Sequence, residues 1–190
     1  MPSGSFENSR LYQTIKNGIS LFNGLVIALP ISIAITFILW IVIKIIEKKC
    51  QLESKIRQVI IQRKRWILAF VFYISLLVQM GILSREIGST REIVLIPFKT
   101  PGGSNLIFLY SLANLVIFIP FGIIVPKVFH SINKVWKMLL VTLATSIAIE
   151  AIQYILACGT SEVEDVIMNV AGGIVGYLII RVIYNKKESK

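Results

Sequence analysis

Five long apolar runs, separated by charged or polar segments, dominate the pattern of the chain. The runs 24–43 and 66–83 carry no charge, and a third extends from about 106 to 125. The runs 138–158 and 166–183 contain a few polar residues. A helix needs about 20 apolar residues to cross a bilayer. The pattern therefore predicts an all-α, polytopic membrane helix bundle with five transmembrane helices.

This pattern also divides the chain. We expect an N-terminal arm (1–23), the first transmembrane helix with a basic loop (24–65), a membrane domain of four helices (66–185) and a basic tail (186–190). Apolar residues recur at helical spacing in the arm, which is either a short interfacial helix or a frayed terminus. Basic residues, not a small-residue cleavage site, follow the first run, so we expect a retained anchor and not a signal peptide.

Composition and charge sharpen this picture. Hydrophobic residues make up 55% and charged residues 16%, which excludes a disordered chain and argues against an ordinary soluble domain. The net charge of +10 would suggest nucleic acid in a soluble protein. Here, if five spans alternate, 15 of the 20 Lys and Arg fall on one side and five on the other. Cytoplasmic loops are enriched in Lys and Arg, so the N-terminus is expected outside and the C-terminus in the cytoplasm.

Cysteines, metals and cofactors add little. Cys50 and Cys158 are expected on opposite sides of the membrane, so no internal disulfide is predicted. Neither a Cys/His cluster with metal-ligand spacing nor a phosphate-binding loop is present in the sequence. We therefore predict no metal, no cofactor and no nucleic-acid partner, with the lipid bilayer as the partner that composition indicates. The oligomeric state is not predicted.

Polar side chains inside the spans are the candidate chemistry, because they are costly in hydrocarbon and usually face a bundle interior or a cavity. Glu150 and Gln153 share one helix face, and so do Asp165 and Asn169. Together with Asn114 in the third run, they lie at depths that allow them to converge in the outer half of the bilayer. The alternative is that the amides join helices by hydrogen bonds. Glu150 needs to be neutral, bonded to another helix or facing water.

The outward segments carry further candidates. Arg85 and Arg91, in the expected outer loop 84–105, either bind phosphate or carboxylate groups of a ligand or pair with neighbouring carboxylates. Residues 161–164 match the capping box S-x-x-E and are interpreted as a helix start within the expected loop 159–164. Asp165 then either favours the helix N-terminus or joins the polar pocket.

Four motifs give the chain a family resemblance. They are REIVLIPF (91–98), NLVIFIPFG (114–122), IEAIQ (149–153) and DVIMNVAG (165–172), and in this order they resemble the VanZ-like family over about residues 82–180. Val94 stands where the family often has Asn. Family members also often carry an Arg shortly before the Asp motif, where this chain has residues 159–161, Gly-Thr-Ser. A role of that Arg is therefore in doubt here.

The resemblance implies a membrane protein of the bacterial cell envelope associated with resistance to the lipidated glycopeptide teicoplanin. We expect an outward-facing pocket that binds a lipid-linked or lipidated anionic ligand, such as a cell-wall precursor or a lipoglycopeptide. Its ligand-binding residues would be Arg85, Arg91, Asn114, Glu150, Gln153, Asp165 and Asn169. One alternative is an intramembrane enzyme that modifies a lipid-linked cell-wall precursor, with Glu150 and Asp165 as acid and base. Another is a structural or partner-binding bundle.

Overall fold

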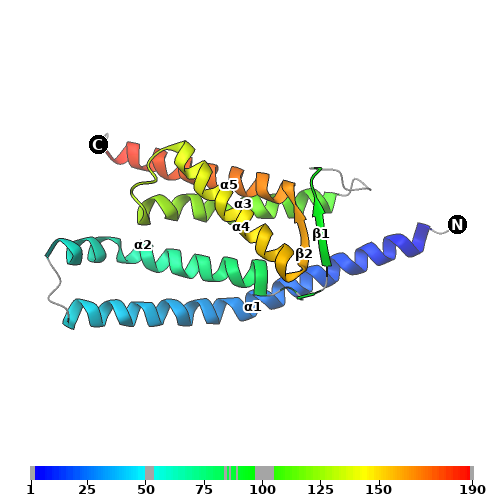
Figure 1. Ribbon diagram of the computed structural model, residues 1–190, viewed down its shortest axis with the longest axis horizontal. Coiled ribbons are helices and arrows are strands. Elements are labelled where there is room, and N and C mark those ends of the chain that lie inside the picture. Colours follow the sequence, from blue (N-terminus) through cyan, green and yellow to red (C-terminus); the bar gives the residue numbers. More distant parts are fainter. Residues whose placement is uncertain are drawn as a thin grey trace.

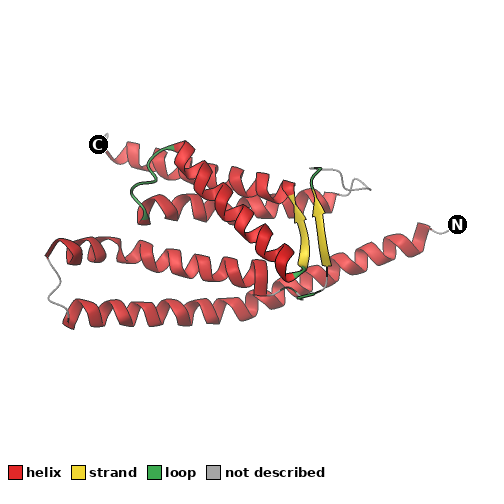
Figure 2. Ribbon diagram, viewed as in Figure 1, coloured by secondary structure: helices red, strands yellow, loops and turns green. Residues whose placement is uncertain are grey.

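The computed structural model describes residues 3–49, 54–83, 85, 87–88, 90–96 and 105–188. Long helices make up most of this part of the chain, and a small sheet lies at one end (Figures 1 and 2). In chain order the elements are α1 (Ser3–Lys49), α2 (Ser54–Val78), the π-helix η1 (Gln79–Leu83), β1 (Thr90–Val94), α3 (Asn105–Val128), α4 (Val135–Leu156), β2 (Cys158–Glu162) and α5 (Val163–Glu188).

The predicted fold class, an all-α membrane bundle, is confirmed. Within the described residues, four helical stretches are long and apolar enough to cross a bilayer: Gly24–Lys48, Arg63–Leu83, Val135–Leu156 and Val163–Asn185. The described apolar stretch of α3, Leu112–Val128, is shorter. The helical arm belongs to α1, which is continuous from Ser3 to Lys49; side chains 3–23 lie outside the described part.

The two ends of the bundle differ. One end, which we call the basic end, holds the C-terminus of the chain, the approach to the α1–α2 connection and the loop between α3 and α4 (Figure 1). Lys and Arg gather there, and Lys64 of α2 pairs with Glu47 of α1 at 3.1 Å. The opposite end, the sheet end, carries both strands (Figure 2). Cys158 is a buried free thiol in β2, whereas Cys50 lies outside the described residues.

Glycines bring α3 and α5 into close contact. Gly172 and Gly176 form the small-xxx-small step that favours close helix approach. A Cβ atom on Gly172 would collide with the Leu115 carbonyl oxygen, and one on Gly176 with the Ile119 carbonyl oxygen. A buried core cluster also joins α3, α4 and α5; its members are Phe118, Phe121, Val125, Met138 and Tyr177.

The two segments expected to be outer loops contain paired strands instead. β1 and β2 form a parallel ladder in which Thr90 faces Cys158 and Val94 faces Glu162. Parallel strands need a long crossover, and here α3 and α4 provide it. The expectation failed because hydropathy carries no information about pairing between segments so far apart in the sequence.

The helix start predicted within residues 161–164 is confirmed, with Glu164 in the first turn of α5, but the capping box that placed Ser161 at the N-cap is wrong. α5 begins at Val163, so Ser161 and Glu162 lie in β2 and not at the predicted positions of the helix start. The Ser161 hydroxyl donates to the main-chain carbonyl of Glu150 at 3.0 Å. The strand ladder fixes the backbone of Ser161, and its side chain therefore joins β2 to α4.

Candidate functional site

The connection from β2 into α5 gathers carboxylates at the sheet end. Glu162 ends β2, and Glu164 and Asp165 follow in the first turn of α5. Acidic side chains are favourable there because a helix N-terminus carries a partial positive charge. Carboxylate oxygens of these three residues lie within 4.8 Å of one another. We call these three residues and the neighbouring Glu150 of α4 the acidic cluster.

Glu150 joins the acidic cluster through β2. Helix α4 ends at Leu156, and Ala157 adopts a left-handed conformation with φ of 50°, which lets the chain turn back beside α4. The main-chain N–H of Glu162 then donates to the Glu150 carboxylate at 3.2 Å. The sequence required Glu150 to be neutral, bonded to another helix or facing water. The structure gives it a bond to a strand.

Two other segments, helix α3 and the segment that holds Arg85, contribute to the same place. The Asn114 side chain of α3 hydrogen-bonds the Asp165 carboxylate. Glu150 and Asp165 lie close enough for their charges to repel each other. Arg85 attracts the carboxylates of Glu150, Glu162 and Asp165. The structure therefore brings together four of the predicted residues: Arg85, Asn114, Glu150 and Asp165.

Arg85 reaches the acidic cluster across Gly159. A Cβ atom on Gly159 would collide with Nη1 of Arg85, so the guanidinium occupies the space that a side chain would fill. Members of the family that the chain resembles often carry an Arg a few residues before the Asp motif, where this chain has residues 159–161, Gly-Thr-Ser. In this chain the guanidinium beside Gly159 belongs to Arg85.

The environment of Glu162, at the end of β2, raises the pKa of its carboxyl group toward neutral pH. Burial, together with the charges of Asp165 and Glu164, raises the pKa of Glu162 from its ordinary value of 4.5 to about 7. Glu162 and Glu164 also share a hydrogen bond. Two carboxyl groups can share one only when one of them carries a proton. The acidic cluster can therefore accept or release a proton under physiological conditions.

Asn169 lies one turn below Asp165 on α5, in the buried interior. It is 5% exposed, and its Nδ2 donates to the Ser146 hydroxyl of α4 at 2.8 Å. Its Oδ1 is buried and has no hydrogen-bond partner within the described part of the chain. Asn169 thus joins α4 to α5 while one of its polar atoms stays available.

Gln153 and Arg91 each donate a hydrogen bond to a main-chain carbonyl oxygen outside the acidic cluster. Gln153 is buried and its Nε2 donates to the Gly81 carbonyl of η1 at 2.9 Å. Arg91 of β1 donates to the Ile155 carbonyl at 3.2 Å, and its guanidinium lies 5.6 Å from the centre of the Tyr154 ring. Both contacts attach segments to the end of α4. A ligand-binding role for either residue stays a prediction.

The sequence did not identify Glu162 and Glu164 as site residues. Both were assigned to a helix start. The signal that could have identified them is their density, because three carboxylates lie within four residues in a chain with ten Asp and Glu. Oxygen ligands of this kind suit hard cations such as Mg²⁺ or Ca²⁺. The same geometry suits carboxyl groups that share protons, so the arrangement alone does not assign a metal.

The fold and the site define a class before any comparison is made: a polytopic helical membrane protein with a polar cluster at one end of its bundle. The sequence model of the VanZ/LLP1 family matches residues 66–184. The chain belongs to this family, as its four motifs predicted.

One curated relative supports the same assignment. The chain is 32% identical over 111 residues to Protein VanZ of Enterococcus faecium. The aligned part covers 58% of this chain and 66%, just under two thirds, of that relative. No solved structure matches the chain. Helix α1 lies outside the residues that the family model matches.

Proposed function

We propose that this VanZ-like membrane protein contributes to glycopeptide resistance in the bacterial cytoplasmic membrane, with its sheet end facing outside. The orientation rests on the 15 Lys and Arg assigned to the basic side against five on the other. In this orientation the N-terminus is outside and the C-terminus is cytoplasmic. The acidic cluster then lies where an extracellular antibiotic or an exported cell-wall precursor can reach it.

The observation that carries the proposal is the convergence of Glu150, Asp165 and Asn114 from three helices, with Arg85 beside them. Polar groups of this kind are costly near hydrocarbon and mark functional sites in membrane proteins. The ligand that fits is the polar head of a lipid-linked precursor or of a lipoglycopeptide such as teicoplanin.

The charges of the acidic cluster and of Arg85 indicate which chemical groups the head of the ligand carries. The acidic cluster holds four carboxyl groups, and Arg85 attracts three of them, those of Glu150, Glu162 and Asp165. An acidic group of the ligand can pair with Arg85, whose guanidinium offers two parallel donors. The carboxylates favour amide, hydroxyl or ammonium donors. We therefore propose a head that carries both an acidic group and several donors, and not a purely anionic one.

Substitution of Glu150 tests the proposal. In a susceptible Gram-positive host, Glu150→Gln should reduce the minimal inhibitory concentration of teicoplanin to that of cells without the protein. Glu92→Gln is the matched control, because Glu92 is an exposed glutamate of β1 outside the acidic cluster. Membrane levels of both variants are measured by immunoblot. Full protection by Glu150→Gln at normal membrane levels would refute the proposal.

Acid–base catalysis on a lipid-linked cell-wall precursor is a second candidate. It is favoured by the proximity of Glu150 and Asp165 and by the pKa of Glu162 near 7, because a general acid or base works best when its pKa lies near the working pH. Purified protein should then convert a lipid-linked precursor to product, and Asp165→Asn should abolish the conversion. Tight binding without any product would leave binding as the function.

A further inference from the structure

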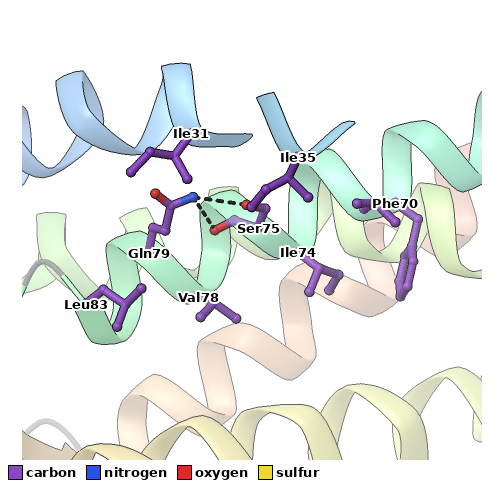
Figure 3. A pocket seen from close by; sticks show the side chains of 9 residues that line it. Ile31, Ile35, Phe70, Ile74, Ser75, Val78, Gln79 and Leu83 are labelled. Carbon is purple, nitrogen blue, oxygen red and sulfur yellow. Dashed lines mark hydrogen bonds between the residues drawn. The ribbon is translucent and has the colours of Figure 1, made fainter. Parts of the chain in front are cut away.

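A groove between α1 and α2 is lined by residues outside the acidic cluster. Its volume is about 420 Å³, and it is lined by Ile31 and Ile35 of α1 and by seven residues between Phe70 and Leu83 (Figure 3). Its lining is almost wholly apolar. The two stretches that form it, Gly24–Lys48 and Arg63–Leu83, are long and apolar enough to cross a bilayer. Hydrocarbon is therefore the medium around the groove.

The polar side chains beside the groove bond to one another. Nε2 of Gln79 donates to the hydroxyls of Ser32 at 2.9 Å and Ser75 at 3.0 Å, and the Ser32 hydroxyl donates to that of Ser75 at 3.0 Å (Figure 3 shows Gln79 and Ser75). These bonds hold α1 against α2. Volume that no atoms fill loses dispersion contacts, so the remaining apolar space favours a hydrocarbon occupant.

The groove has the length and the position of an acyl-chain site. From Phe70 to Leu83 it extends roughly 20 Å at about 1.5 Å per residue. One leaflet of a bilayer contributes about 15 Å of hydrocarbon. Leu83 precedes Arg85 by two residues, which places their Cα atoms within about 7 Å. The end of the groove therefore lies near the backbone of the residue whose guanidinium reaches the acidic cluster.

We infer that the groove between α1 and α2 holds the acyl chain of the ligand whose polar head lies at the acidic cluster. This inference rests on the proposed function and assigns the lipid part of its ligand to a place. It also gives α1, which lies outside the matched family residues, a part in ligand selection: the chain length and the shape of the lipid are selected by Ile31, Ile35 and the opposite wall of α2.

A tryptophan that blocks the groove tests the inference. Ile35→Trp places the new ring in the groove, whereas Ile41→Trp lies about 240° around α1 and lines neither described cavity. The two isoleucines are 42% and 38% exposed, so the variants are matched in residue type and in exposure. Full-length protein in nanodiscs is titrated with teicoplanin and with teicoplanin from which the acyl chain has been removed, and binding to empty nanodiscs is subtracted.

The wild-type protein and Ile41→Trp should bind the acylated compound at least tenfold more tightly than the deacylated one. Ile35→Trp should bind both with the affinity of the deacylated compound. Val78→Trp, which blocks the opposite wall, should give the same result and replaces Ile35→Trp if that variant does not fold.

Other outcomes separate the two proposals. Equal binding of both compounds by the wild-type protein, or wild-type affinity in the groove variants, overturns the inference and leaves the proposed function standing. A phospholipid retained in the groove, seen by native mass spectrometry with unchanged affinity in Ile35→Trp, also overturns it. If the wild-type protein binds neither compound, the proposed binding function fails and the inference fails with it.

Discussion

Replacing Gly176 with alanine should force α3 and α5 apart. The added Cβ would collide with the main-chain carbonyl oxygen of Ile119 and lie 3.0 Å from the Cα of Gly122. Both obstacles are backbone atoms, so no change of rotamer can make room. The two helices must shift, and the core formed by Phe118 and Tyr177 must loosen with them.

The magnitude follows from two opposing effects. Alanine is more favourable than glycine within a helix by about 1 kcal/mol. Overpacking of a tight contact costs about 1–3 kcal/mol, and an obstacle made of backbone places Gly176 at the upper end. The net loss in the free energy of unfolding should therefore be about 2 kcal/mol for Gly176→Ala.

Unfolding by SDS in mixed micelles, followed by circular dichroism, measures this difference. Gly81→Ala is the control, because a Cβ on Gly81 would meet nothing within 4 Å. It should leave stability unchanged or increase it by up to about 1 kcal/mol, from helix propensity alone. If Gly176→Ala proves as stable as wild type, the close approach of α3 and α5 is wrong.

Three further predictions concern the acidic cluster and the α1–α2 contact. Burial raises the pKa of Glu162 from 4.5 to about 7, so the folded chain binds that proton more tightly than the unfolded chain does. The free energy of unfolding should therefore fall as pH rises through this window. Glu162→Gln should flatten this fall in denaturation curves recorded between pH 4 and 8. Gly159→Ala should displace Arg85 and raise the pKa of Glu162 further, and an unchanged carboxyl band in infrared titration would contradict this. Gln79→Leu should lower stability by about 1 kcal/mol, since interhelical hydrogen bonds in membranes contribute about 0.6–1.7 kcal/mol, and unaltered unfolding would show that these bonds hold nothing together.

The helices could be predicted from sequence because their signal is local. A charge-free run of the length that crosses a bilayer is visible without any knowledge of the fold. The spacing of Gly172 and Gly176 is also visible in the sequence, and small residues one turn apart on one face favour a close helix contact. Glu150 and Asp165 were identified because a carboxylate in an apolar run is conspicuous.

The remaining features depend on contacts between distant segments. Thr90 pairs with Cys158, and nothing near either residue indicates this partner. Ser161 and Glu162 belong to β2, so the pairing of β2 with β1 sets their backbone conformation, and the local capping pattern does not. Gln79 was not identified because it lies about one turn before the end of the apolar run 66–83, where an amide usually meets water. Its partner Ser32 lies on another helix.

The parallel pairing of β1 with β2 also orders the assembly of the protein during synthesis. Strand β1 leaves the ribosome before α3 and α4, but its ladder partner follows both of them. Its main-chain groups therefore have no strand partner until α4 has been inserted and Cys158–Glu162 has been translated. The acidic cluster includes Glu162 of β2, and it is consequently completed at the end of biogenesis. A nascent chain arrested after α3 would be anchored in the membrane without its site.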